Sequence, residues 1–228
     1  MPHPPLDALF LEHVGPSLAK HLALLHAVEG LPCHADLKRG DVRFGERYTF
    51  PVQLLGIEDR KAQTWTWSWD LPAGIVAKPL TRAALDLKAW GEAHDLDLFF
   101  VPNFQLSNLS GDQIAILSCG LAQSAAFLIM EIPLGTAFFL LPDLKNQMTS
   151  RHTAAFLSEV LREMLTAYTL PDHRAAVRSL LLFESYDLDE TEAGTWRARR
   201  TADRSQITVG FDAEGRVAQL QVDDPARA

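Results

Sequence analysis

His152, Asp172 and His173 combine the residue types that general acid–base catalysis uses. A carboxylate beside an imidazole can orient the ring, so Asp172 and His173 could act as an orienting acid and a base, with His152 nearby. Asp172 also stands where it could cap a helix that runs through Val177 and Leu180. In this second interpretation Asp172 binds backbone amides and His173 is partly exposed. The sequence favours the helix cap and leaves the acid–base pair as the alternative.

A cluster of arginines near the C-terminus could bind anions: Arg197, Arg199, Arg200 and Arg204. Because a guanidinium can donate two parallel hydrogen bonds, it suits a carboxylate, a phosphate or an acidic partner surface. The simpler interpretation is a solvated face of a hairpin. We name Arg197, Arg199 and Trp67 as candidate ligand or partner contacts, at a seam between a tryptophan-bearing hairpin and a C-terminal meander.

No motif for a metal, a cofactor or a nucleophile accompanies these residues. None of the eight histidines is spaced i, i+4 from another, so no pair shares a helix face in the manner of a zinc site. The sequence has neither a Gly-x-Ser-x-Gly elbow nor a glycine-rich phosphate loop. Cys33 and Cys119 lie far apart, which predicts reduced thiols. We therefore expect no metal and no cofactor, and we assign no catalytic residue.

Charge and composition narrow the range of partners. With 47% hydrophobic and 22% charged residues the chain resembles an ordinary globular protein, so long disorder is not expected. A formal net charge of −8 argues against nucleic acid or an anionic membrane surface as the main partner. The most apolar segment, residues 125–141, is interrupted by Glu131, Pro133 and Gly135, which predicts two buried strands rather than a membrane span. Because no signal peptide is recognisable either, we expect a soluble cytoplasmic protein.

Three alternating tryptophans, Trp65, Trp67 and Trp69, define the element that must organise the fold. In an extended strand residues i, i+2 and i+4 point to one side, so one strand through all three predicts a face of three indoles. Residues 42–54 also alternate, and a charged turn at residues 58–61 predicts an antiparallel hairpin. We expect helices to bury the indole face. The alternative is an aromatic wall for a ring-bearing ligand, a sugar or a peptide.

Helical periodicity and turn signals complete the expected architecture. The pattern predicts a first helix broken or kinked at Gly15-Pro16, a helix starting at Pro79, and a capping box at residues 110–113 that opens a third helix. A helix pair and a three-stranded meander follow, with strands at residues 196–200, 205–211 and 216–222. The predicted fold class is α+β. We divide the chain into residues 1–145 and 146–228, with a soft boundary because no flexible linker separates them.

The sequence resembles an uncharacterised family of bacterial proteins, a domain of unknown function. That family has a Leu-Gly turn, a polar hairpin, a Trp-x-Trp-Ala-Trp-type strand and a helix that ends near Gly-x-x-His. Ser68 stands here in place of the alanine, and Asp70 in place of a small or amide residue. The resemblance supports the fold and implies no activity. The matching segments are Leu55-Gly56, the tryptophan strand, Gly91-Glu-Ala-His94, Asp172-His173-Arg174-Ala175 and Phe211-Asp-x-x-Gly-Arg216.

We expect a non-catalytic binding or protein-interaction module of the bacterial cytoplasm. Its expected partners are a second copy of the chain, another protein or a small anionic ligand. The alternative is a small-molecule enzyme that assembles His152, Asp172 and His173. A concave pocket with converging polar groups of shifted pKa would favour the enzyme, and a convex surface would favour the interaction module.

Overall fold

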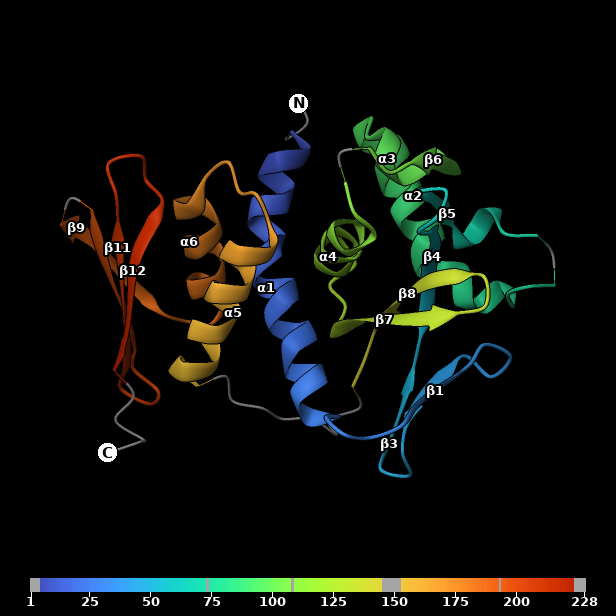
Figure 1. Cartoon of the computed structure of the whole chain (residues 1–228), viewed down its shortest axis with the longest axis horizontal. Coiled ribbons are helices and arrows are strands. Elements are labelled where there is room, and N and C mark those ends of the chain that lie inside the picture. Colours follow the sequence, from blue (N-terminus) through green and yellow to red (C-terminus); the bar gives the residue numbers. More distant parts are fainter. Residues whose placement is uncertain (1–4, 73, 108, 145–152, 193, 224–228) are drawn as a thin grey trace. The chain divides into compact units, whose positions relative to one another are not determined.

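The computed structural model describes residues 5–72, 74–107, 109–144, 153–192 and 194–223 (Figure 1). The chain forms two compact units, each with its own helices and antiparallel sheet. The first unit comprises Met1–Leu6 and Leu24–Thr149, and the second comprises Asp7–Ala23 and Ser150–Ala228. These helices and antiparallel sheets confirm the α+β fold class.

Within its described residues, the first unit holds a three-stranded sheet, a five-stranded sheet and five helical segments. The small sheet has the order β1-β2-β3, with β1 (Cys33–Asp36), β2 (Asp41–Phe44) and β3 (Tyr48–Pro51). The larger sheet has the order β6-β5-β4-β8-β7, with β4 (Gln53–Asp59), β5 (Thr64–Trp67), β6 (Asn103–Gln105), β7 (Ala126–Ile132) and β8 (Gly135–Leu141). The helical segments are the 3-10 helices η1 (Ser68–Asp70) and η2 (Lys78–Thr81) and the α-helices α2 (Arg82–His94), α3 (Asp97–Phe100) and α4 (Gly111–Leu121).

Helices cover the tryptophan-bearing face of the larger sheet, as predicted. Trp65 and Trp67 are both 0% exposed. The ring of Trp65 lies 5.2 Å from that of Phe138 on β8, and Trp67 lies 6.0 Å from Phe99 on α3, between ring centroids. The indole Nε1 of Trp67 donates to the carbonyl oxygen of Leu98 at 3.0 Å. These contacts make the two indoles part of the core of the unit.

Trp69 does not share the strand with the other two tryptophans, and this part of the prediction was wrong. The ladder between β4 and β5 ends at the pair Gly56 and Trp67, beside a bulge in β4 between Leu54 and Gly56. The hydroxyl of Ser68 donates to the carbonyl of Leu54 at 2.6 Å, so a side chain takes the place of a ladder hydrogen bond. The chain then turns into η1, which carries Trp69.

Gly56 lies inside β4, not in a turn as the Leu-Gly motif suggested. A Cβ atom at Gly56 would stand 2.6 Å from the Thr66 carbonyl oxygen and 2.6 Å from a ring carbon of Trp65. These distances are too short for non-bonded carbon contacts, so the space that glycine leaves empty is filled by the indole.

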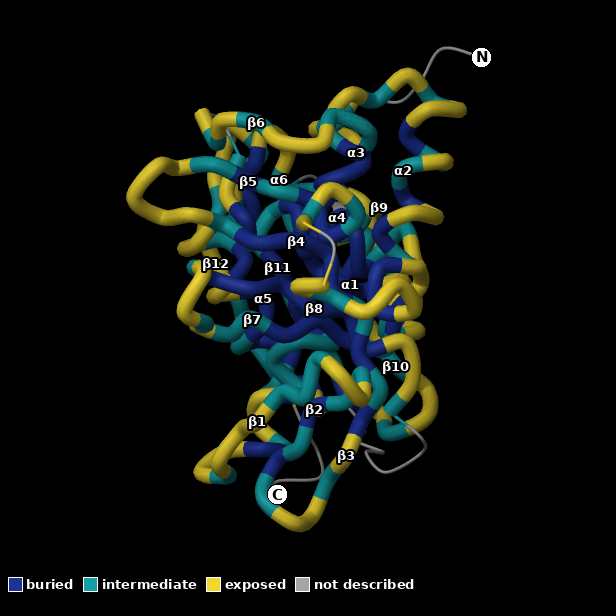
Figure 2. The backbone as a smooth tube through the Cα atoms, turned by 90° about the vertical axis from the view of Figure 1, so that its right-hand side faces the viewer, coloured by how far each residue is buried: buried dark blue, intermediate teal, exposed yellow. Residues whose placement is uncertain are grey.

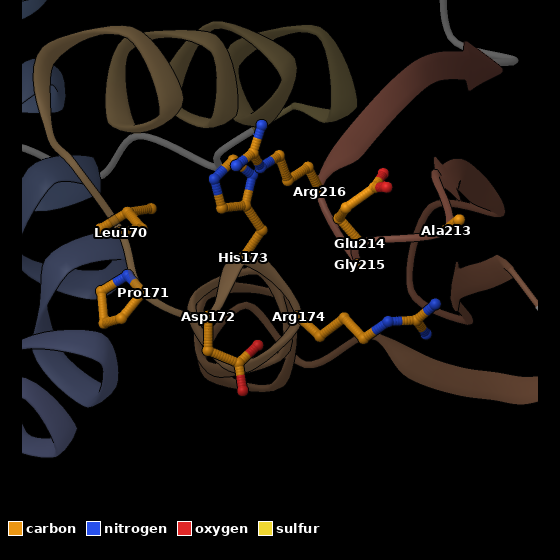
Figure 3. Close-up of a pocket in the computed structure, with 9 residues that line it drawn as sticks. All are labelled: Leu170, Pro171, Asp172, His173, Arg174, Ala213, Glu214, Gly215 and Arg216. Carbon is orange, nitrogen blue, oxygen red and sulfur yellow. The ribbon is translucent and has the colours of Figure 1, made fainter.

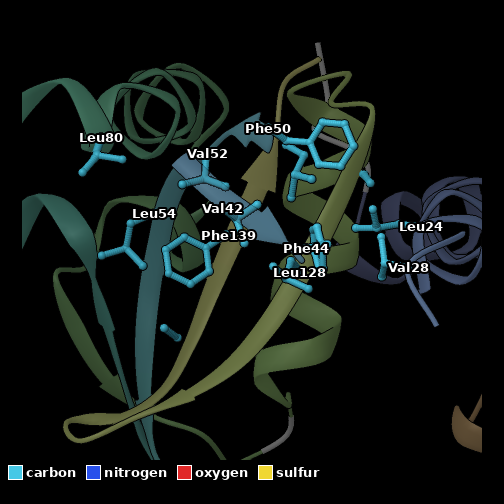
Figure 4. Packing of buried hydrophobic residues seen from close by; sticks show 13 residues of the cluster. Leu24, Val28, Val42, Phe44, Phe50, Val52, Leu54, Leu80, Leu128 and Phe139 are labelled. Atoms are coloured by element: carbon cyan, nitrogen blue, oxygen red, sulfur yellow. The ribbon is translucent and has the colours of Figure 1, made fainter. Parts of the chain in front are cut away.

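The opposite face of the larger sheet packs against the small sheet and the end of the first helix. Alternation along β4 and β8 places Leu54 and Phe139 on this side. Figure 2 shows β4 and β8 as buried segments, and Figure 4 shows the cluster. Its members are Leu24, Val28, Val42, Phe44, Phe50, Val52, Leu54, Leu80, Ala126, Leu128, Ala137, Phe139 and Leu141.

The second unit packs three helices with a four-stranded meander of order β12-β11-β10-β9. The meander has one strand more than predicted, because β9 adds to the edge beside β10. Alternating residues of β11 are buried, so one face of the sheet belongs to the core. The elements are α1 (Leu6–Ala27), of which only Asp7–Ala23 belongs to this unit, α5 (Ala154–Ala167), α6 (His173–Phe183), β9 (Asp187–Glu192), β10 (Thr195–Arg200), β11 (Ser205–Phe211) and β12 (Val217–Asp223).

The starts of α4 and α2 and the interior of α1 test the capping and proline signals of the sequence. The capping box is confirmed: the Ser110 hydroxyl accepts from the Gln113 amide, and the Gln113 side chain accepts from the Ser110 amide. Pro79 lies in η2, and α2 begins three residues later at Arg82. α1 continues through Pro16 without the predicted break. Beside it, a Cβ at Gly15 would stand 2.6 Å from that of Leu180 on α6, so the glycine permits a close helix contact.

Replacing Trp67 by alanine should remove about 3–5 kcal/mol from the free energy of unfolding, because the indole is fully buried and its cavity cannot collapse between the sheet and α3. Urea unfolding followed by circular dichroism measures the change. The control is Thr49→Ala at an exposed position of β3, which should stay within about 0.5 kcal/mol of the wild type. An unchanged midpoint for Trp67→Ala would show that the indole does not stabilise the core.

Candidate functional site

A cavity of about 670 Å³ lies in the second unit, between the start of α6 and the turn that joins β11 to β12 (Figure 3). The volume is within the range of roughly 300–1,000 Å³ that small-molecule sites occupy. The lining residues come from two short segments, Leu170–Arg174 and Ala213–Arg216. Polar side chains dominate this lining, so the cavity suits a charged or hydrogen-bonding ligand better than an apolar one.

The start of α6 is fixed by Asp172. Its Oδ1 atom accepts from the Ala175 amide at 3.0 Å, which is the helix cap that the sequence favoured. In Figure 3 the Asp172 carboxylate points away from the His173 ring. The Nδ1 atom of His173 instead accepts from the Val217 amide at 3.3 Å, which connects α6 to the start of β12. When the imidazole is neutral, this contact leaves its proton on Nε2.

The turn on the other side of the cavity is organised by Asp212. Its Oδ1 atom accepts from the amides of Glu214 at 3.0 Å and Arg216 at 2.8 Å. Gly215 supplies the positive φ of 78° that the turn requires. Asp212 thus holds the backbone of Arg216 through its side chain and its amide, and the Arg216 side chain extends toward His173 in Figure 3.

Arg174 and Arg216 give the cavity its positive charge. The guanidinium carbon of Arg174 lies 4.3 Å from the ring centroid of Phe211 and 5.4 Å from that of Trp196. Stacking on these rings restricts the guanidinium and leaves its edge donors available. Among the described residues neither arginine has an ion-pair partner. In the same unit Arg178 pairs with Glu190 at 2.5 Å.

The residues predicted as ligand contacts lie elsewhere. Trp67 belongs to the first unit and is a core side chain. Arg197 and Arg199 belong to β10 of the second unit, where Arg197 is opposite Asp189 and Arg199 is opposite Asp187. The Nε atom of Arg199 donates to Gln206 at 3.0 Å. The contact role of Trp67, Arg197 and Arg199 stays a prediction. His152 lies outside the described residues.

Sequence reasoning passed over Arg174 and Arg216 as site residues, although both belong to segments that it singled out. The signal that could have found them is the pair of aspartate-led turns, Asp172-His173-Arg174 and Asp212-x-x-Gly215-Arg216. In each turn the aspartate side chain holds the local backbone, and an arginine follows the aspartate, two residues later in the first turn and four residues later in the second. That the two turns lie together depends on the packing of α6 against the meander.

A second polar cluster in this unit is structural. Arg200 donates to Asp203 through Nη2 at 2.5 Å, and Asp203 Oδ1 accepts from the Ser205 hydroxyl at 2.7 Å. The Ser205 hydroxyl also lies 2.8 Å from that of Tyr186, and both residues are buried. The Arg200 guanidinium and the Ser205 donors hold the pKa of Asp203 well below its usual value, even though partial burial opposes this. The cluster ties the β10–β11 turn to the segment before β9.

The fold and the cavity describe an α+β protein with a polar site outside the tryptophan-bearing core. Residues 7–144 match DUF6882, a family of unknown function, and since this range is more than half of the chain, the protein belongs to that family. The arginine-lined cavity lies outside the matched range. No curated protein and no solved structure matches the chain.

Two further findings concern the described residues alone. None of their helices is long and apolar enough to cross a membrane. No group of three or more histidine, cysteine, aspartate or glutamate side chains in this part of the chain is placed to hold a metal ion.

Asp203→Asn should lower the free energy of unfolding at pH 7 by about 1–3 kcal/mol, because it removes a charged hydrogen-bond acceptor from Arg200 and Ser205. The folded pKa of Asp203 is depressed below the unfolded value of 3.8. Its stabilisation is therefore present above pH 3.8 and is lost as the pH falls through the folded pKa. Urea unfolding of both proteins at several pH values measures the difference.

The matched control is Asp187→Asn, an exposed carboxylate on β9 of the same unit. We expect it to change stability little at any pH. A difference between Asp203→Asn and the wild type that stays constant down to acid pH would contradict the charged role of Asp203.

Proposed function

We propose that this protein is a non-catalytic binding module whose cavity in the second unit takes a ligand through a carboxylate or phosphate group. The observation that carries the proposal is the presence of Arg174 and Arg216 on one cavity, neither with an ion-pair partner in the described part of the chain. In a protein of net charge −8, two such guanidinium groups are the natural contacts of an anion.

The two arginines supply different parts of the site. Arg174 is held over Phe211, so its position is fixed before a ligand arrives, which lowers the entropy cost of binding. Arg216 is exposed, with a side chain free to close on the anion. Glu214 also lines the cavity, and its carboxylate favours ligands that carry a hydrogen-bond donor beside the anionic group.

The arrangement of Asp172 and His173 supports binding over acid–base catalysis. A catalytic pair would need the carboxylate on the imidazole, whereas Asp172 is engaged with the Ala175 amide and His173 with the Val217 amide. In the folded protein both side chains hold the walls of the cavity. The strongly shifted carboxyl pKa of this unit lies at Asp203, which does not line the cavity.

We also propose that the protein acts in the bacterial cytoplasm as a homodimer and that its two units are separate domains. The free thiols of Cys33 and Cys119 fit a reducing compartment. Light scattering of the purified protein distinguishes a dimer from a monomer.

Inorganic phosphate and succinate are the probes for the arginine cavity. One of the two should raise the melting temperature of the wild type, and Arg216→Gln or Arg174→Gln should weaken its binding about tenfold, because each variant removes a charged hydrogen-bond partner worth about 1.4 kcal/mol or more. Calorimetric titration measures the affinities.

Arg162→Gln is the control, since it removes an exposed arginine of the same unit, on α5, that does not line the cavity. It should bind the probe like the wild type. Equal affinity in all four proteins, or equal stabilisation by chloride at the same ionic strength, would show a general salt effect and overturn the proposal.

A further inference from the structure

A second cavity, of about 410 Å³, lies in the first unit beside η1, η2 and α2. It is bounded mainly by apolar side chains, among them Trp69, Leu71, Val76 and Leu85. Leu85 is 44% exposed, although a large apolar side chain normally gains by burial. The cavity therefore offers apolar surface that an apolar ligand body would cover.

The polar groups of this cavity divide into two kinds. The hydroxyls of Ser68 and Thr81 are engaged, because they donate to the carbonyls of Leu54 at 2.6 Å and Lys78 at 2.9 Å. The ammonium group of Lys78 is exposed and has no ion-pair partner among the described residues. It is the charged side chain of the lining that remains available to a ligand.

The indole of Trp69 adds a second unused donor. Its Nε1 atom is buried and has no hydrogen-bond acceptor in the described part of the chain. A buried N–H without an acceptor is unfavourable, and a ligand oxygen can supply the missing acceptor. The ammonium group of Lys88 lies 4.7 Å from the Trp69 ring centroid, but it is paired with Glu92 at 3.7 Å, so Lys78 carries the charge that a ligand would meet.

We infer that this cavity binds an amphipathic monocarboxylate, a molecule with one carboxylate and a compact hydrocarbon or aromatic body. The carboxylate pairs with Lys78 and accepts a hydrogen bond from the indole Nε1–H of Trp69 after a small adjustment of the ring. The apolar body covers Leu85 and Val76. The cavity lies within the range that matches DUF6882 and in a different unit from Arg174 and Arg216, so this inference is independent of the proposed function.

Octanoate and octanamide test the inference, because they share a hydrocarbon chain and differ in charge. In ¹⁵N-labelled full-length protein, octanoate should move the indole N–H resonance of Trp69 and leave that of Trp65 in place, with a dissociation constant of about 1 mM or tighter. Trp69→Phe and Trp65→Phe assign the two resonances. Trp65 is the matched control because its Nε1 also lacks an acceptor in the described residues while the ring is 0% exposed.

Three further variants separate charge from apolar contact. Lys78→Gln should weaken octanoate binding about tenfold and leave octanamide binding unchanged, whereas Leu85→Gln should weaken both. Lys61→Gln, in the exposed turn after β4, should alter neither. The inference is overturned if octanoate moves no Trp69 resonance at about 10 mM, if Lys78→Gln binds octanoate like the wild type, or if Lys61→Gln weakens it equally.

Discussion

The contact between the Trp65 indole and the empty side-chain position of Gly56 is the constraint on which the first unit depends. It lets β4 and β5 pair while the Trp65 ring occupies the space beside Gly56. Phe138 then packs on Trp65, and Gly111 at the start of α4 approaches so near that a Cβ there would lie 2.4 Å from the Phe138 ring. Glycines at two positions thus allow α4, the three strands β4, β5 and β8, and an indole to share one layer of the core.

Local signals in the sequence predicted the elements that depend on neighbours along the chain. The capping box at Ser110, the cap at Asp172, the hairpin of β7 and β8 and the return of the tryptophan strand are each set by a few consecutive residues. The α+β class followed from these elements. The features that the sequence did not predict depend on distant contacts: Trp69 leaves the strand where Ser68 bonds to Leu54, and α1 continues unbroken through Pro16 while Gly15 lies against Leu180.

The difference between local signals and contacts of distant residues also explains which site residues the sequence predicted. The sequence singled out Asp172 and His173 because a carboxylate beside an imidazole can perform acid–base catalysis. In the structure their hydrogen bonds to backbone amides hold the wall of the cavity. The guanidinium groups without an ion pair among the described residues are those of Arg174 and Arg216. Which arginines pair with a carboxylate depends on tertiary packing: within the part of the chain that the structure describes, Arg200 and Arg178 do so and these two do not. The second cavity, in the first unit, has Trp69 in its lining because the chain turns at η1. The alternation of tryptophans in the sequence did not predict this turn.

The stability of Gly56→Ala tests the central constraint most directly. A strand glycine in open space gains about 0.5–1 kcal/mol when replaced by alanine, because alanine loses less backbone entropy on folding. At Gly56 the added methyl group meets the Thr66 carbonyl and the Trp65 ring, so we predict a loss of about 1–3 kcal/mol in the free energy of unfolding. A variant as stable as the wild type, or more stable, would contradict the account.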